Sequence, residues 1–456
     1  MAKGTQKESH LKNLLRPIKI GPVELRHRMV LAPMNETLSG GDGHATEQMI
    51  AYFGARAKGG AAWVSTGAIF GTRLGSQFVW GRNLYLFHEG FIQGLTLLTD
   101  RIHYFGSLAT AQMTIGFGRQ GHSYDHSLKV PAPTAGLPYE IALDKIPKAM
   151  EGLAKKIEMS RLFMNGQMTR ELSIEEIRSE QKEFARSCQL AIIAGFDVIE
   201  IHAPHGYLEH EFLSPLTNKR TDMYGGEWRN RKRFLNEVME QVRYACPGLA
   251  VGVRISNQEY MEGGLTFDEM IDVAQDLEAR GADYISLSAG GGYEESGHLI
   301  TDKDRAQHLP EIAKKFKGAL KIPVILASQH DPVKADKDIA AGKYDINALG
   351  RQLFCDPEYP NKVARSAVKK IVFCTYCNTC AIRCLMGSTP ACPQNPNLGR
   401  EYALDEYRIG PRQKHEDLIP MAMLRQPPPA LDRPWWKPEL PAIERCWRKF
   451  TGPGPR

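Results

Sequence analysis

The stretch VIEIHA at residues 198–203 is a short, mostly apolar run whose last two residues are a histidine and an alanine. Immediately upstream, SIEEIRSEQKEFARSCQLAIIAG at 173–195 has a helical pattern, with a cap-like Ser173 at its start and Gly195 at its end. A buried strand that follows a helix in this way is typical of parallel sheets, because a helical crossover joins successive strands. A second helix of the same kind, TFDEMIDVAQDLEARG, is expected at 266–281.

Eight apolar runs bounded by turn residues are candidate buried strands. They are VLAPM at 30–34, WVSTG at 63–67, SLATAQM at 107–113, VIEIHA at 198–203, AVGVRIS at 250–256, YISLSAG at 284–290, PVILAS at 323–328 and INALG at 346–350. Parallel strands joined by helices form either a doubly wound sheet or a closed barrel, and a count of eight favours the barrel. We therefore predict an α/β protein with a (β/α)8 TIM barrel at 1–370, a cysteine-rich segment at 371–400 and a proline-rich tail at 401–456.

Composition excludes several classes of protein. The chain has 456 residues, of which 42% are hydrophobic and 24% charged. It lacks an apolar run of the roughly 20 residues that a membrane helix needs, so neither disorder nor membrane spanning is expected. The net charge of +6 is spread without dense basic runs, which argues against nucleic acid as a partner. The N-terminus, MAKGTQKESHLKNLLRPIKI, lacks the apolar core of a secretory signal, so we expect a cytoplasmic protein with reduced thiols.

Reactive groups of such a barrel lie at the carboxyl ends of its strands. The densest group of polar residues there is His202, His205 and Tyr207. Two imidazoles can polarise one substrate oxygen and a phenol can donate a proton, whereas in a purely structural interpretation the histidines only cap loop backbone groups. Arg254 ends the next strand and could stabilise developing negative charge, with a surface ion pair as the alternative.

The loops after the seventh and eighth strands are expected to bind a phosphate group. Backbone amides near Ser328, Gln329, Gly350 and Arg351 precede helices, where converging amides and the helix dipole favour anions. GFGRQG at 116–121 matches a dinucleotide-binding pattern, but the residues after it predict a loop and no βαβ unit follows. We therefore interpret it as a loop.

Five of the nine cysteines fall between Cys374 and Cys392. Closely spaced thiolates followed by a later cysteine next to proline are typical of an iron–sulfur cluster. Zinc is the alternative, although a zinc ribbon would present two separated CxxC pairs. The expected ligands are Cys374, Cys377, Cys380 and Cys392. Cys384 is the spare thiol, and the sequence also permits it to replace Cys380.

Several long motifs in order resemble one family. These are LLRPIKIGPVELRHRMVLAPM at 14–34, IHAPHGYLEHEFLSPLTNKRTDMYGG at 201–226, ALGRQLFCDPEYPNK at 348–362 and CTYCNTC at 374–380. Over residues 12–400 the chain resembles the Old Yellow Enzyme superfamily, in the iron–sulfur branch that includes 2,4-dienoyl-CoA reductase and trimethylamine dehydrogenase. The resemblance implies a TIM barrel with FMN at its mouth and a 4Fe-4S cluster just after it.

The resemblance also implies roles for individual residues. His202 and His205 match the pair that binds the substrate oxygen, Tyr207 matches the proton donor, and Cys374, Cys377, Cys380 and Cys392 match the cluster ligands. FMN would lie against Pro33, Met34, Gly67, Gln112 and Arg254, with its phosphate near Ser328, Gln329, Gly350 and Arg351. Ser328-Gln329 departs from the Gly-Asn or Gly-Arg pair of relatives, and MTIGFGR replaces their LxHxGR after Gln112.

The expected activity is reduction of the C=C bond of an α,β-unsaturated carbonyl or enoyl thioester, by hydride from FMN and a proton from Tyr207. Oxidative dehydrogenation or demethylation of a methylated amine is one alternative, although those relatives carry tyrosine where His202 stands. An electron-transfer or scaffold subunit is the other. Larger relatives carry a flavin- and NAD(P)H-binding region that we do not expect here. A separate electron-donor protein, with NAD(P)H as an indirect source, and a homo- or hetero-oligomer are therefore expected.

Overall fold

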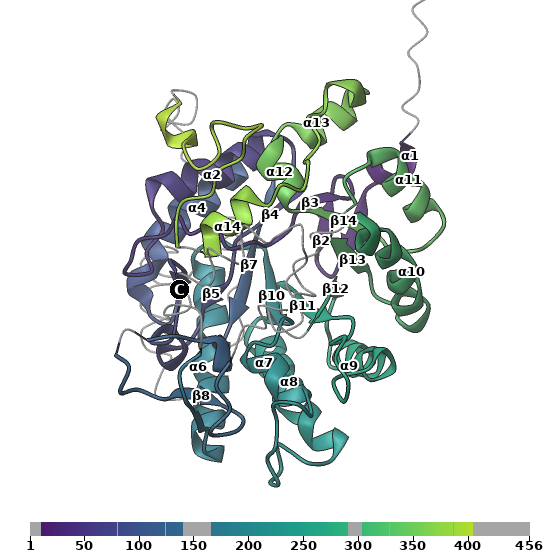
Figure 1. Ribbon diagram of the computed structural model, residues 1–456. Helices are drawn as coiled ribbons and strands as arrows, with labels where there is room; N and C mark the ends of the chain where they lie inside the picture. The colour runs from purple at the N-terminus through teal and green to yellow at the C-terminus, as the bar shows by residue number, and fades with distance from the viewer. Residues whose placement is uncertain are drawn as a thin grey trace, which may run out of the picture.

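Eight parallel strands close into a barrel in the computed structural model, which describes residues 11–79, 81–123, 125–139, 166–290, 303–327, 329–385 and 387–404 (Figure 1). The strands are β3 (Met29–Leu31), β4 (Trp63–Ser65), β7 (Leu108–Thr114), β10 (Val198–Ala203), β11 (Ala250–Ser256), β12 (Tyr284–Ser288), β13 (Val324–Ala327) and β14 (Ile346–Leu349). Each pairs in parallel with its neighbour, and β10 pairs with β7 to complete the ring. The predicted TIM barrel is confirmed.

The half of the barrel interior nearest the amino-terminal ends of the strands is packed with apolar side chains. Val30, Trp63, Val198 and Tyr284 form a buried cluster there with alanines and isoleucines of the other strands. A hairpin of β1 (Ile18–Ile20) and β2 (Val23–Leu25) adds its own apolar side chains to the same cluster. This end of the barrel is therefore closed, and an open cavity is left only for the opposite end.

Helices surround the barrel and bury their apolar faces against the outside of the strands. They are α2 (Glu47–Lys58), α4 (Ile92–Tyr104), α6 (Ile174–Ile193), α8 (Trp228–Ala245), α9 (Phe267–Ala279), α10 (Lys303–Ala319), α11 (Pro332–Ala340), α12 (Arg351–Cys355) and α13 (Tyr359–Ala364). Ser173 and Thr266 each cap their helix through a capping box with a glutamate. Both predicted helices are thus confirmed, with the caps at the expected residues.

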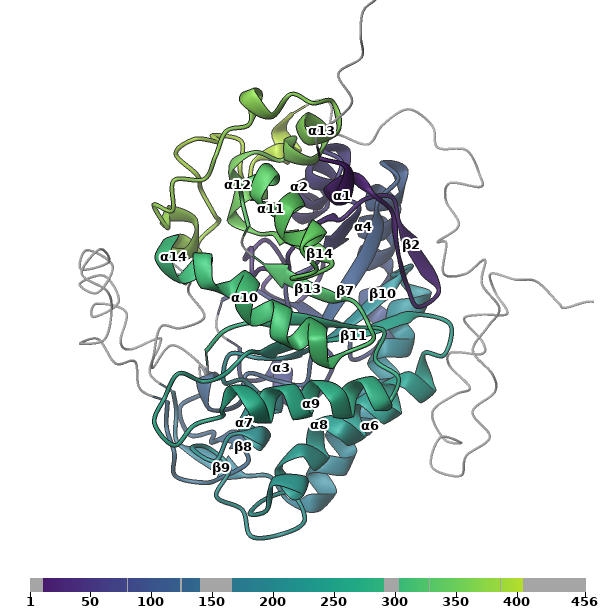
Figure 2. The ribbon, with the colours of Figure 1, turned by 90° about the vertical axis from the view of Figure 1, so that its right-hand side faces the viewer.

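Shorter helices and strands lie around these barrel elements or connect them. They are α1 (Lys12–Leu15), β5 (Ile69–Phe70), α3 (Arg73–Ser76), β6 (Leu84–Tyr85), η1 (Glu89–Phe91), η2 (Gly118–Gln120), β8 (Val130–Ala132), β9 (Thr169–Glu171), α7 (Leu208–Leu213), η5 (Val368–Lys370), α14 (Thr379–Leu385) and η6 (Glu401–Ala403). Figure 2 shows β2 and α14 at opposite ends of the barrel. The cysteine-rich segment therefore lies at the barrel mouth, away from the closing hairpin.

Strands β8 and β9 pair in parallel in a two-stranded sheet that is separate from the barrel sheet. Residues 140–165 and 405–456 lie outside the described residues, and these include most of the proline-rich tail. The start of the tail packs on α2, where the buried Glu401 accepts a hydrogen bond from Arg56. The described beginning of the tail therefore belongs to the barrel body.

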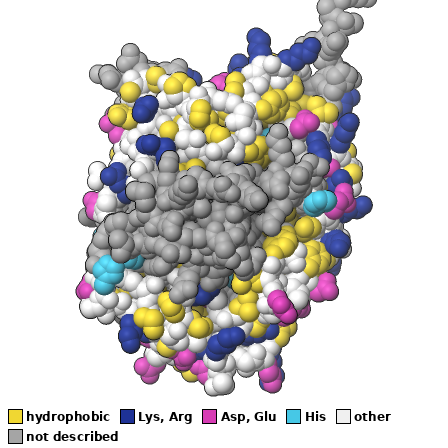
Figure 3. Space-filling model, in the orientation of Figure 1, with side chains coloured by type: hydrophobic (Ala, Val, Ile, Leu, Met, Phe, Trp, Pro, Cys, Tyr) yellow, Lys and Arg dark blue, Asp and Glu magenta, His cyan; other side chains and the backbone are white. Residues whose placement is uncertain are grey.

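Two general properties of the described chain bear on partners. None of its helices combines the length and hydropathy that crossing a bilayer requires. On the face seen in Figure 3, Lys and Arg side chains are interspersed with Asp and Glu around the outline. This distribution agrees with the absence of dense basic runs from the sequence.

Candidate active site

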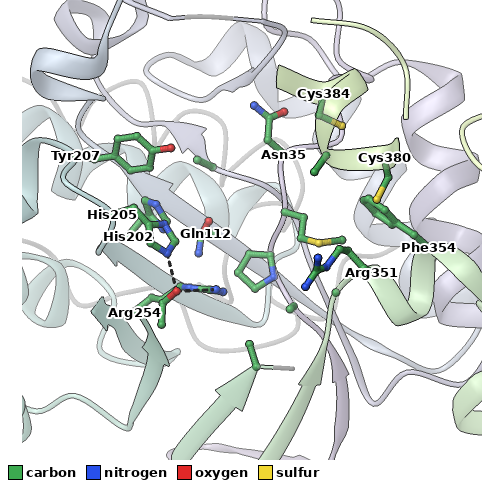
Figure 4. Close-up of a pocket in the computed structure, with 18 of the residues that line it drawn as sticks. Asn35, Gln112, His202, His205, Tyr207, Arg254, Arg351, Phe354, Cys380 and Cys384 are labelled. Carbon is green, nitrogen blue, oxygen red and sulfur yellow. Dashed lines mark hydrogen bonds between the residues drawn. The ribbon is translucent and has the colours of Figure 1, made fainter. Parts of the chain in front are cut away.

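A cavity of about 270 Å³ opens at the carboxyl ends of the strands (Figure 4). The predicted site residues that line it are Pro33, Met34, Gln112, His202, His205, Tyr207, Arg254, Gly350 and Arg351. His202, His205 and Tyr207 lie on one side, and Arg351, Phe354, Cys380 and Cys384 lie on the other (Figure 4). Predicted residues from five strand ends thus meet in one space, as expected from parallel strands that end at the same edge.

The end of β10, with His202, and the loop after it, with His205 and Tyr207, present the two histidines and the tyrosine together. The ring centroid of His202 lies 5.4 Å from that of His205 and 5.3 Å from that of Tyr207. His205 Nε2 is 2.6 Å from Ser288 Oγ, and the His205 backbone N–H donates to Ser256 Oγ. The ends of β11 and β12 therefore hold His205, and its imidazole faces the cavity with its two partners.

Tyr207 is buried against an aromatic cluster. Its ring lies 4.7 Å from that of Phe117, which in turn packs edge-to-face on Phe70 at 4.8 Å. Phe117 comes from the GFGRQG segment, in which η2 forms and no α-helix follows. That segment is therefore a loop as predicted, and it supplies an apolar wall beside the phenol.

The sequence interpretation missed the contribution of Gln120, from the same segment. His205 and Gly206 both have positive φ, 68° and 69°, a conformation that costs energy for histidine. The buried Gln120 amide donates to His205 O at 2.7 Å and to Gly206 O at 2.8 Å. This one side chain therefore stabilises the turn that aims His205 and Tyr207 into the cavity.

Replacing Gln120 with alanine is expected to lower the free energy of unfolding by about 1–3 kcal/mol, because two buried hydrogen bonds are lost. Urea unfolding measures the change. Gln275→Ala is the matched control, since Gln275 donates from the surface to Ala319 O, and it should change stability by less than about 0.5 kcal/mol. Equal midpoints for the two variants would show that Gln120 does not support the turn.

Buried ionisable residues of α7, the helix that begins after Tyr207, hold the loop after β10 in place. Glu209 accepts hydrogen bonds from the Ile115 N–H at 2.7 Å and the Thr114 hydroxyl at 3.1 Å, and burial raises its pKa to about 8. Glu211 accepts from the Arg119 N–H at 2.8 Å. These contacts fasten α7 to the loop after β7. Three ionisable side chains in the short run LEHEFL were the available signal for this anchoring, since such residues are buried only when paired.

Arg254 is a buried guanidinium directed at the cavity. It is 7% exposed, burial lowers its pKa, and the carboxylate of Glu200 acts in the opposite direction. Its Nη2 lies 3.5 Å from Ser288 Oγ, while Nε and Nη1 have no hydrogen-bond partner in the described structure. Buried donors of this kind need an acceptor, so the cavity is suited to a ligand with electronegative atoms above Arg254.

Gln112 is oriented by the same buried glutamate. Its Nε2 donates to Glu200 Oε1 at 2.7 Å, and the Tyr284 hydroxyl donates to Glu200 Oε2 at 3.3 Å. The amide oxygen of Gln112 is thereby left for the cavity that this residue lines. Glu200 was not among the predicted site residues, although its place two residues before His202 puts it on the same inward face of β10.

Two predicted cofactor residues are not part of the cavity wall, and a third is outside the described residues. Gly67 and Gln329 do not line the cavity, and Ser328 lies outside the described residues. Gly67 instead packs against the loop after β3, where an added Cβ would come within 2.5 Å of Met34 O. Gln329 accepts a hydrogen bond from Asn347 through its carbonyl oxygen. Their neighbours Ala68 and His330 do line the cavity, so both positions border it.

The four predicted cluster cysteines line one second, smaller pocket. Cys374, Cys377, Cys380 and Cys392 surround it together with Cys355, Arg351 and Phe354. Cys380 lines both this pocket and the large cavity, whereas Cys384 lines only the large cavity. Among the described residues, no three His, Cys, Asp or Glu side chains are arranged to hold a metal ion.

Sequence comparison reveals a family and relatives. The sequence profile described as "NADH:flavin oxidoreductase / NADH oxidase family" matches residues 13–370. An NADH oxidase of Thermoanaerobacter brockii is 31% identical over 89% of this chain and 59% of its own, and a cinnamate reductase of Clostridium sporogenes is 32% identical over 86% and 58%. The chain thus spans somewhat less than three fifths of these curated relatives.

Solved structures agree with the sequence match. A 2-naphthoyl-CoA reductase in complex with 2-naphthoyl-CoA superposes with a TM-score of 0.76 at 28% identity, covering 86% of this chain and 58% of the other. An old yellow enzyme homologue from Zymomonas mobilis shares the fold, with a TM-score of 0.64 over 79% of this chain and 94% of the other. The profile match over residues 13–370 together with this barrel shows that the chain belongs to the NADH:flavin oxidoreductase / NADH oxidase family, within the Old Yellow Enzyme superfamily.

Proposed function

We propose that the protein reduces the C=C bond of an α,β-unsaturated carbonyl compound or enoyl thioester, with FMN and a 4Fe-4S cluster as resident cofactors. The observation that carries the proposal is the convergence of His202, His205 and Tyr207 on one wall of the cavity, across from its Arg351 side. The names of two relatives, cinnamate reductase and 2-naphthoyl-CoA reductase, support a conjugated acid or thioester as substrate.

The residues of the cavity fit a flavin. The unpartnered Nε and Nη1 of Arg254 suit the electronegative edge of an isoalloxazine ring, and the Gln112 amide oxygen is an acceptor for a ring N–H. Pro33 and Met34 supply apolar contact from the loop after β3, and Gly350 and Arg351 lie where such barrels bind phosphate. When bound, reduced FMN supplies a hydride to the substrate carbon next to it.

This chain's own residues perform the remaining tasks. His202 and His205 hold the substrate carbonyl oxygen and stabilise the negative charge that develops on it as the double bond is reduced. Tyr207 donates the proton to the α-carbon, and the phenolate that remains takes up a proton from solvent before the next turnover. Phe117 packs against the Tyr207 ring and Phe70 packs against Phe117, so an apolar wall supports the ring of the proton donor.

The lining of the cysteine pocket supports the proposed cluster. Cys374, Cys377, Cys380 and Cys392 all border this one small space, and iron–sulfur clusters of this type are held by four cysteine thiolates. Cys380 belongs to the walls of both cavities, so a cluster bound there would lie next to the flavin. We infer that electrons enter through this cluster. The separate electron-donor protein stays a prediction. The division of the chain into domains at 1–370, 371–400 and 401–456 also stays a prediction.

A flavin reoxidation screen tests the proposal. The protein is reconstituted with FMN, photoreduced without oxygen and mixed with enones, cinnamate and aromatic or enoyl thioesters. We expect the 450 nm flavin band to return with at least one of these compounds. Failure of every conjugated carbonyl compound would overturn the proposal, and bleaching of the oxidised flavin by methylated amines would favour the amine reaction instead.

A further inference from the structure

The cysteine-rich segment and the large cavity share residues at one place in the fold. Arg351, Phe354 and Cys380 line both the cavity and the cysteine pocket. Arg351 and Phe354 belong to α12, which directly follows β14 at the end of the cavity where a cofactor phosphate is expected (Figure 4). Any change in the cysteine segment therefore acts on residues that also face the cavity.

Tyr376, which lies between Cys374 and Cys377, packs on two residues of the cavity wall. Its ring stacks on that of His330, with centroids 4.9 Å apart and an interplanar angle of 18°. The Arg351 guanidinium lies 4.9 Å from the centroid of the same ring. His330 lies in the loop after β13, and Arg351 is the first residue of α12, which follows β14, so one aromatic ring of the cysteine segment packs on both sides of the expected phosphate site.

The backbone of the cysteine segment is held in a special conformation around this ring. Tyr376 and Asn378 both have positive φ, 59° and 58°. Arg351 Nη1 donates to Asn378 Oδ1 at 2.6 Å, and Gln352 Oε1 accepts from the Cys374 N–H at 3.0 Å. Left-handed conformations at non-glycine residues persist only where surrounding contacts hold them. A cluster bound to the flanking cysteines would be such a constraint.

His330 is poised to respond to a ligand. It is 8% exposed, it lines the cavity, and its Nδ1 has no hydrogen-bond partner in the described structure. Its backbone carbonyl is fixed by the Tyr359 hydroxyl at 2.8 Å. The stack with Tyr376 therefore contributes to the orientation of the ring, and with it to the position of a polar atom at the cavity wall.

We propose that Tyr376 is a positioning residue that couples the cluster segment to cofactor binding: it holds His330 and Arg351 in place for the FMN phosphate end, so that loading of the cluster strengthens FMN binding. The inference rests on the proposed pair of cofactors. By linkage, FMN binding favours the cluster-loaded conformation by the same factor.

The test is an anaerobic titration of the cluster-loaded, FMN-stripped chain with FMN, followed by quenching of flavin fluorescence. Iron and sulfide are quantified in each sample. Tyr376→Ala is expected to bind FMN about tenfold more weakly with its cluster content unchanged. Tyr376→Phe keeps the ring and should stay within about twofold of the wild type, as should Phe373→Ala, an exposed aromatic of the same segment that lines neither cavity.

A double-mutant cycle with Cys377→Ala separates coupling from simple weakening. Loss of the cluster should weaken FMN binding in the wild-type background and add little in the Tyr376→Ala background. Additive effects, or unchanged FMN affinity in Tyr376→Ala, would overturn the inference while leaving the proposed cofactors in place. Wild-type protein that binds no FMN or no cluster would overturn the proposed function and the coupling together. If Tyr376→Ala does not fold by circular dichroism, Tyr376→Leu takes its place with the same expectations.

Discussion

Replacing Tyr207 with phenylalanine is expected to lower turnover of the best conjugated substrate by about 10²- to 10⁴-fold, because the α-carbon loses its proton donor. The ring would keep its contacts with Phe117 and His202, so the fold and the cavity should be preserved. Stopped-flow measurement of flavin reoxidation reports the loss, while photoreduction of the flavin should proceed as in the wild type.

Tyr85 provides the matched control for this substitution. It packs on the same Phe70 at 6.1 Å but does not line the cavity, and its hydroxyl makes only a long hydrogen bond of 3.4 Å to Ser76 O. Tyr85→Phe should therefore turn over like the wild type. Turnover of Tyr207→Phe within about twofold of that control would exclude Tyr207 as the proton donor.

Replacing Cys377 with alanine should abolish reduction of the flavin by a one-electron donor, because the cluster through which electrons enter loses a ligand. Reduced ferredoxin serves as the donor and the decay of the flavin band as the measurement. FMN is supplied at saturating concentration, since loss of the cluster is expected to weaken its binding. Photoreduction of the same variant should still occur.

Cys384→Ala tests the assignment of the cluster ligands. Cys384 lines only the large cavity, whereas Cys380 also lines the pocket that the other predicted ligands share. We expect Cys384→Ala to keep its iron and sulfide content and its reduction by ferredoxin. Loss of the cluster in Cys384→Ala, together with retention of the cluster in Cys380→Ala, would reverse the two assignments.

Local sequence patterns determine the barrel. Apolar strands such as 198–203 and 250–256 were located to the residue, and Ser173 and Thr266 cap their helices as expected. Apolar strand runs and helix caps are patterns of residues that are close together in the sequence, so they can be recognised without knowing the tertiary structure. The parallel strand order then implies that strand-end residues, among them His202, Tyr207 and Arg254, meet at one edge.

What holds those side chains in position was decided by contacts between distant segments. Gln120 supports His205 across a sequence separation of 85, and Tyr376 reaches His330 in a different loop. No periodicity in the sequence marks such pairs, because the two residues come within contact distance only after the barrel has closed. Cys380 and Cys384 show the same limit. One turn of α14 separates them, and only the packing of that helix at the barrel mouth places Cys380 in the pocket with the other cysteines and Cys384 in the large cavity. Which of them binds the cluster stays a prediction.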